Sequence, residues 1–150
     1  MRVSRSALRS SLPSIVVALL LFAVAARAQE AVVPEADRAA IRAVIEQQLA
    51  AFARDDAAGA FAFASPAIQR QFGTPDVFMR MVRTAYPTVY RPRAVSFGET
   101  RIMDYAIVQQ LDLIGPNGTG EHAFYVMEQE EDGSWRINGV AMQPGAQQEI

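Results

Sequence analysis

The residues that could take part in acid–base chemistry are few in this chain of 150 residues. His122 is its only histidine, and Glu128 opens an acidic run that continues to Asp132. Either side chain could act as a general base, with a tyrosine such as Tyr86 or Tyr105 as the proton donor. That chemistry requires the base to lie within about 3 Å of the proton that it moves, inside a shared pocket.

The motifs of the common catalytic and metal sites are absent from the sequence. There is no HExxH, CxxC or GxSxG motif, and the glycine-rich stretch GPNGTG joins two predicted strands and precedes no helix. One histidine, scattered carboxylates and no cysteine do not supply the clustered ligands that a metal ion needs. We therefore expect no metal and no cofactor, and we assign no catalytic residue.

The first 28 residues have the pattern of a signal peptide. Arginines near the start are followed by an apolar run from Ile15 to Ala26, and Ala26 and Ala28 suit a cleavage site before Gln29. The run is shorter than the roughly 20 residues that span a bilayer, although a retained membrane anchor is the alternative. We expect an exported protein, periplasmic or extracellular after cleavage near Ala28, that meets the membrane only through its signal peptide.

The charge of the chain bears on its partners. Of its 14 basic residues, all arginine, four lie in the predicted signal peptide, which leaves 10 against 16 acids and a net charge of −6. Because such a surface repels phosphate backbones, we expect no nucleic-acid partner.

Helix start signals recur through the first half of the mature chain. Acidic, hydroxyl and proline residues stand at the positions typical of helix caps and first turns. They predict a long helix from Pro34 to Phe52, a short one from Ala57 to Ala64, a turn from Ser65 to Phe72 that ends at Gly73, and a helix from Thr74 to Tyr86.

The apolar period changes from 3.6 to 2 after Pro92. Ala94 to Ile102 predicts a first strand, broken or bulged at Gly98, and a three-strand meander follows from Ala106 to Met142. We therefore expect an α+β fold in which the N-terminal helices pack on a curved antiparallel sheet of about four strands. The predicted parts are a signal peptide (1–28), a leader (29–35), a single domain (36–143) and a C-terminal tail (144–150).

The turns of the meander predict its register. If Asn117-Gly118 and Asp132-Gly133 are two-residue type I′ turns, Leu113 faces His122 and Ile137 lies beside Glu128. The face that the helices cover then collects Tyr105, Ile107, Gln109, Leu111, Leu113, His122, Phe124, Val126, Glu128, Trp135, Ile137 and Ala141. The other face collects Val108, Gln110, Asp112, Tyr125, Met127, Gln129, Arg136, Asn138 and Val140.

Three polar residues interrupt the predicted apolar face, and each needs a partner or a cavity because burying an unpaired polar group costs about 1–3 kcal/mol. Gln109, in the middle of its strand, is the first choice for a pocket residue, either bonded to Tyr86 or facing a ligand. His122 lies near a strand end, where it is either a rim side chain or a pocket residue. Glu128 points either inward or into solvent.

Three segments make the chain resemble a known family: FARDDAAGAFAFASP, TPDVFMRMVRTAYP and FYVMEQEEDGSWRINGV. Together they resemble the bacterial family DUF4864 (domain of unknown function), a branch of the nuclear transport factor 2-like superfamily, over about Ala36 to Met142. The resemblance implies an α+β cone with a cavity between sheet and helices. Some superfamily members use it for lyase or isomerase chemistry, and others for ligand binding or dimerisation. No motif match gives a catalytic role to Tyr86, Tyr105, His122 or Glu128.

Two hypotheses follow. The first is an exported, non-catalytic protein that binds a small apolar ligand or a partner protein through the cone cavity or the sheet. The alternative is a small cofactor-free acid–base enzyme of the lyase or isomerase type, with Glu128 or His122 as the base. A homodimer through the other face of the sheet, at Val108, Tyr125, Met127 and Val140, is compatible with both.

Overall fold

The computed structural model describes residues 32–145, so the predicted signal peptide and residues 146–150 of the predicted tail lie outside the described residues. The described elements are α1 (Glu35–Ala53), α2 (Ala57–Ala62), α3 (Pro66–Phe72), α4 (Pro75–Ala85), α5 (Pro87–Tyr90), β1 (Ala94–Met103), β2 (Ala106–Ile114), β3 (Gly120–Gln129) and β4 (Trp135–Pro144). The predicted α+β class is confirmed. No helix within residues 32–145 is both long and apolar enough to cross a membrane.

The helix starts follow the predicted signals. Asp56, Ser65 and Thr74 each accept a hydrogen bond from the backbone N–H three residues further on, at 2.8, 3.2 and 3.3 Å. These bonds satisfy N–H groups that the first helical turn leaves without a partner. Gly73 ends α3 with a φ of 74°, a conformation that favours glycine. The short helix α5 was not predicted.

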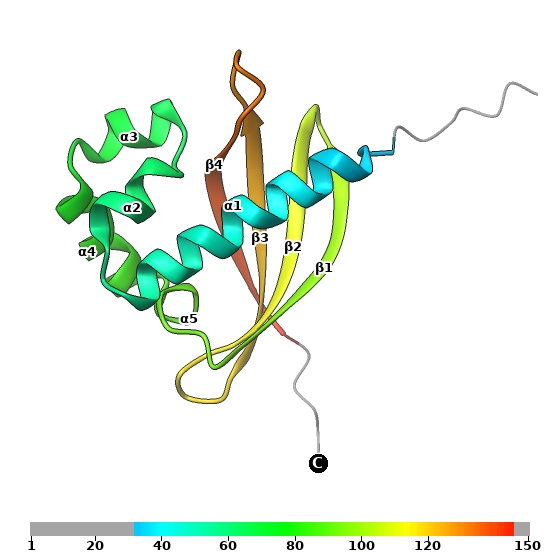
Figure 1. Ribbon diagram of the computed structural model, residues 1–150. Coiled ribbons are helices and arrows are strands. Elements are labelled where there is room, and N and C mark those ends of the chain that lie inside the picture. The colour runs from blue at the N-terminus through cyan, green and yellow to red at the C-terminus, as the bar shows by residue number, and fades with distance from the viewer. Residues whose placement is uncertain (1–31, 146–150) are drawn as a thin grey trace, which may run out of the picture.

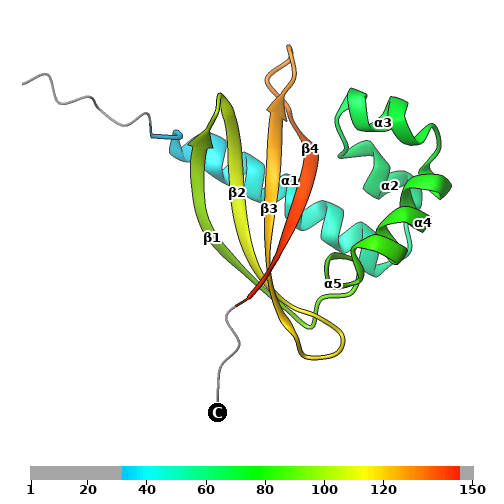
Figure 2. The same ribbon diagram turned by 180° about the vertical axis from the view of Figure 1, so that it is seen from behind.

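The four antiparallel strands lie in the order β1-β2-β3-β4. The long helix α1 crosses one face of the sheet, and α2, α3 and α4 gather beyond β4 (Figure 1). We call the face under α1 the inner face. The opposite, outer face has no described helix in front of it (Figure 2).

The register of the first hairpin differs from the prediction by one residue. Leu113 pairs with Glu121, and His122 pairs with Asp112. The N–H of Gly115 bonds the carbonyl of Thr119 at 2.8 Å, which leaves a three-residue loop in which Gly118 has a φ of 83°. A type I turn followed by a left-handed glycine uses one more residue than the expected type I′ turn.

The second hairpin repeats this loop. The N–H of Glu130 bonds the carbonyl of Ser134 at 2.8 Å, and Gly133 has a φ of 84°. Ile137 therefore pairs with Met127, and the predicted pairing with Glu128 is wrong. A bulge between Met127 and Val126 then restores the predicted pairing further along β4.

Because of the one-residue shift, the side chains of β3 lie on the faces opposite to those predicted. Tyr125 and Met127 face inward and are buried, whereas His122, Phe124, Val126 and Glu128 belong to the outer face. Val140 also moves to the inner face, opposite Tyr125. The prediction holds for Leu111 and Leu113 of β2 and for Trp135 and Ile137 of β4, all of which are buried.

Candidate functional site

A pocket of about 220 Å³ lies between the helices and β4, and we call it the apolar pocket. Phe52 of α1 and Phe72 of α3 contribute to its wall, and Met81 and Val82 of α4 add further apolar surface. The opposite wall consists of Ile137, Gly139 and Val140 of β4. The site is therefore built where the helical group meets an edge strand.

An aromatic cluster stiffens the helical wall. The ring of Phe78 lies 6.2 Å from Phe52, 5.3 Å from Phe61 and 5.7 Å from Phe72, centre to centre. These separations are within the range that favours aromatic pairs. Because Phe78 is 6% exposed and packed from three sides, this wall is preformed.

Backbone pairing attaches the helices to one end of β4. Ser65 donates its N–H to the carbonyl of Ile137 at 2.9 Å, and Ile137 donates its own to the carbonyl of Phe63 at 2.8 Å. The Ser65 hydroxyl also donates to Oδ1 of Asn138 at 2.7 Å. This part of the strand edge is closed by the chain itself.

The polar groups of the wall are neutral. Gln48 is 3% exposed and donates its amide to the carbonyl of Ala60 at 3.1 Å, and the Tyr86 hydroxyl donates to the carbonyl of Val140 at 3.3 Å. Gln71 is the third polar side chain of the lining. Within residues 32–145, no charged side chain lines the apolar pocket. The arrangement can accept an apolar group but offers no carboxylate or imidazole as a base.

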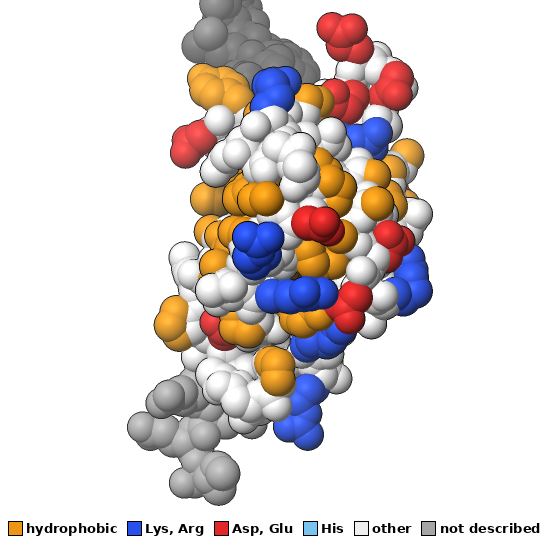
Figure 3. All heavy atoms as spheres, turned by 90° about the vertical axis from the view of Figure 1, so that its left-hand side faces the viewer, with side chains coloured by type: hydrophobic (Ala, Val, Ile, Leu, Met, Phe, Trp, Pro, Cys, Tyr) orange, Lys and Arg blue, Asp and Glu red, His pale blue; other side chains and the backbone are white. Residues whose placement is uncertain are grey.

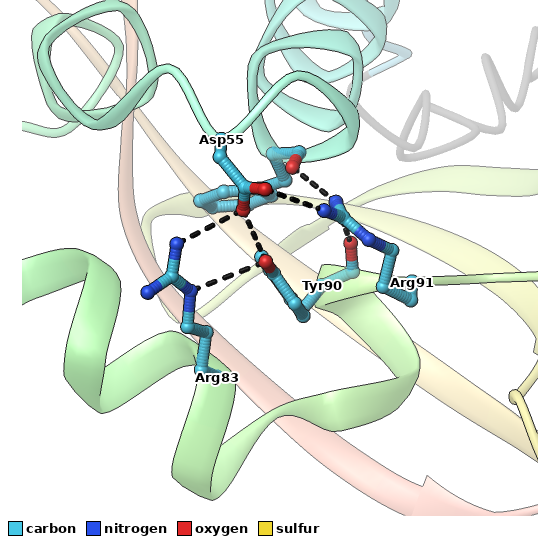
Figure 4. Close-up of polar contacts among 5 residues, drawn as sticks. Asp55, Arg83, Tyr90 and Arg91 are labelled. Atoms are coloured by element: carbon cyan, nitrogen blue, oxygen red, sulfur yellow. Dashed lines mark hydrogen bonds and ion pairs between the residues drawn. The ribbon is translucent and has the colours of Figure 1, made fainter.

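A charged cluster beside the pocket links the turn after α1 to α4 and α5 (Figure 4). Asp55 accepts hydrogen bonds from Arg83 and Arg91, each at 3.0 Å, and from the Tyr90 hydroxyl. Tyr90 and then Arg83 hold the pKa of Asp55 below its ordinary value. Arg91 also donates to the carbonyl of Phe52, near the end of α1. This cluster fixes α4 and α5, which carry part of the pocket wall.

The surface on the helical side of the molecule contains both charged and apolar side chains. Seen from the helical side, arginine and carboxylate side chains alternate with apolar ones, and a group of acidic side chains stands at the top (Figure 3). This distribution gives no extended surface of one charge on this side.

A family model places the chain among known proteins. The model described as "Domain of unknown function (DUF4864)" matches residues 34–150. The chain belongs to the DUF4864 family. No curated protein and no solved structure matches the chain.

The segments that carry the family resemblance surround the apolar pocket in this DUF4864 domain. The first runs from residue 52 to 66 and contributes Phe52 and Ala64, and the second, from 74 to 87, contributes the residues of α4. The third, from 124 to 140, contributes Ile137 and Val140. The residues matched by the family model include the whole lining of the pocket.

A second, wider hollow of about 590 Å³ lies between α3 and the turn that joins β3 to β4. It is lined by Glu130, Glu131 and Asp132, with Arg136 among them. Among the described residues, no three acidic or histidine side chains are grouped so that they could hold a metal ion. The apolar pocket, which is less open and has a mostly apolar lining, is the better candidate site of the DUF4864 domain.

Of the predicted site residues, Tyr86 lines the apolar pocket and Gln109 does not. Gln109 is buried, but its amide donates to the carbonyls of Gly98 at 3.1 Å and Gln110 at 2.8 Å. Its carbonyl accepts from the hydroxyl of Thr100 at 2.5 Å. Gln109 therefore holds the β1 bulge, which was predicted at Gly98, and is not bonded to Tyr86.

The other three predicted residues lie away from the pocket. Tyr105 is fully exposed in the turn between β1 and β2. His122 is on the outer face, where its Nδ1 lies 2.6 Å from Oδ1 of Asp112, and Glu128 is opposite Arg136 on the same face. The missed pocket residues, such as Ile68 and Met81, are ordinary apolar helix positions that no sequence motif distinguishes.

Proposed function

We propose that this DUF4864 protein is a non-catalytic binding protein that holds a small, neutral, apolar group in the apolar pocket. The observation that carries the proposal is the pocket itself, which combines a preformed aromatic wall with three uncharged polar side chains, Gln48, Gln71 and Tyr86. Concave, mostly apolar sites with a few polar groups are the usual form of small-molecule sites.

The volume of the pocket limits the size of the bound group. At about 220 Å³ it is smaller than the pockets of roughly 300–1,000 Å³ that hold drug-sized ligands. It exceeds the engineered cavity of about 150 Å³ that accepts benzene. A benzene ring with a short substituent therefore fits, and so does one apolar side chain of a partner protein.

The lining also favours a neutral group over an ion. A charge moved from water into this wall would meet no opposite charge, and burying an unpaired ion is strongly unfavourable. Arg83 and Arg91, in the charged cluster of α4 and α5, are already engaged by Asp55.

The acid–base alternative loses the residues on which it rested. His122 and Glu128 lie on the outer face, away from Tyr86 and the apolar pocket. The required contact of about 3 Å between a base and a tyrosine hydroxyl is therefore not formed by these residues.

Three earlier expectations stay predictions. We infer an exported location from the signal-peptide pattern of residues 1–28, and a place in the nuclear transport factor 2-like superfamily from the resemblance of residues 52–66, 74–87 and 124–140 to its DUF4864 branch. A homodimer through the outer face also stays a prediction, with Val108, Phe124 and Val126 there instead of Tyr125, Met127 and Val140.

Titration of the ¹⁵N-labelled protein with cumene (isopropylbenzene), followed by NMR, tests the proposal. We expect chemical-shift changes centred on α3, α4 and β4, and their loss in the pocket-filling variant Ile68→Trp. The control Ala67→Trp places the same side chain at the neighbouring, exposed position of α3 and should leave binding unchanged. Shifts confined to the outer face, or none in the wild-type protein, would contradict the proposal.

A further inference from the structure

One buried polar group on the inner face of the sheet has no hydrogen-bond partner among the described residues. Tyr125 is 0% exposed, and its hydroxyl forms no hydrogen bond with any residue in 32–145. An unsatisfied buried hydroxyl costs about 1–3 kcal/mol, and most buried polar groups in proteins are hydrogen-bonded. The structure therefore contains an unused donor in its core.

The position of Tyr125 relates it to the pocket. It pairs with Val140 across β3 and β4, on the inner face, and Val140 is part of the pocket wall. Side chains paired in this way have Cβ atoms about 4.5–5.5 Å apart. Tyr125 thus lies on β3, the strand next to the edge strand β4 that forms one wall of the pocket.

The neighbouring polar side chain on the other strand is already occupied. Gln109 pairs with Tyr125 across β2 and β3, but its amide and carbonyl are bonded to the bulge of β1 and to Thr100. On the pocket side, Val140 is only half-buried, and it follows the bulge in the edge strand β4. Tyr125 itself does not line the apolar pocket, so a bound group could reach it only if the side chain of Val140 moved.

We propose that the hydroxyl of Tyr125 is the hydrogen-bond donor for a neutral acceptor, such as a ketone or ether oxygen, on the apolar group that the pocket binds. This inference rests on the proposed function and deepens it, because it defines the ligand as an apolar body with one acceptor atom. Burial raises the pKa of Tyr125, so the hydroxyl keeps its proton and remains a donor.

Acetophenone and cumene form a matched pair of probes, because they have similar shapes and only acetophenone has a carbonyl acceptor. In the variant Tyr125→Phe, we expect acetophenone to bind about threefold to tenfold more weakly than in the wild-type protein, the loss of one neutral hydrogen bond. Cumene should bind at least as well as before. The stability of the variant should be unchanged or higher, since it loses only an unsatisfied hydroxyl.

A spectroscopic measurement on the wild-type protein keeps the test independent of the variant. With ¹³Cζ-labelled tyrosine, the Tyr125 signal should shift with acetophenone and not with cumene. If cumene binds but acetophenone has the same affinity for the wild-type protein and for Tyr125→Phe, the inference about Tyr125 is wrong and the proposed function still stands. The same holds if cumene binds but the Tyr125 signal does not shift when acetophenone is added. Failure of cumene to bind the wild-type protein would overturn the proposed function and this inference with it.

Discussion

The hydroxyl of Tyr86, at the end of α4, donates a hydrogen bond to the carbonyl of Val140 at 3.3 Å and so joins the helical wall of the apolar pocket to β4. Tyr86→Phe keeps the ring and removes this bond. We expect a loss of about 0.5–1.5 kcal/mol in the free energy of unfolding, measured by urea denaturation. An unchanged midpoint would show that the bond does not hold α4 against β4.

Gln109 is expected to act on stability and not on ligand binding. Gln109→Leu should lower the free energy of unfolding by about 1–3 kcal/mol, because the carbonyls of Gly98 in the β1 bulge and of Gln110 in β2 lose their donor. Gln110→Leu, on the outer face, is the control and should change stability by less. Urea unfolding curves of both variants measure the effect on stability. If Gln109→Leu instead weakened cumene binding and left stability normal, Gln109 would be a pocket residue.

The left-handed glycines should be sensitive to substitution. Gly118→Ala and Gly133→Ala each place a Cβ at a φ near 83° or 84°, which should cost about 1–2 kcal/mol. Gly139→Ala is the matched control, since no atom lies within 4 Å of the added Cβ. It should be neutral or stabilise the protein by about 0.4–1 kcal/mol. Equal effects at all three positions would contradict the loop geometry.

The cluster around Asp55 should make stability depend on pH in the acid range. Its bonds to Tyr90, Arg83 and Arg91 hold the pKa of Asp55 below the ordinary 3.8. A lowered pKa stabilises the fold at pH values above 3.8, and this contribution is lost as the pH falls through the lowered value.

Asp55→Asn should therefore lower the unfolding temperature at neutral pH and have progressively less effect below pH 3.8. Asp104→Asn is a suitable control, because Asp104 also has a positive φ of 46° but forms no ion pair within residues 32–145. Thermal unfolding of both variants across the pH range checks the prediction. A difference between wild-type protein and Asp55→Asn that persists undiminished in acid would contradict it.

The helices could be predicted from sequence because their signals are local. Ser65 and Thr74 cap the first turn of the helices that follow them, and Gly73 ends α3, as expected. The charged cluster around Asp55 could not be predicted in this way. Arg83, Tyr90 and Arg91 are distant from it in the sequence, and only the packing of α4 and α5 brings them together.

The register of β3 could not be predicted because both of its faces are apolar. Phe124 and Val126 suit a buried face as well as Tyr125 and Met127 do, so the turns alone had to decide. Asn-Gly and Asp-Gly fit both a type I′ turn and the longer loop in which only the glycine is left-handed. The one-residue difference moved His122 and Glu128 out of the candidate site and brought Tyr125 inside.

The apolar pocket between α3, α4 and β4 is expected to hold a small neutral group. A crystal structure of the protein grown with cumene tests this expectation. We expect density for the ring between Ile68, Val82 and Val140, with the backbone of α4 and β4 unmoved. An empty pocket at a cumene concentration that saturates the protein in solution, or a probe bound on the outer face instead, would contradict it.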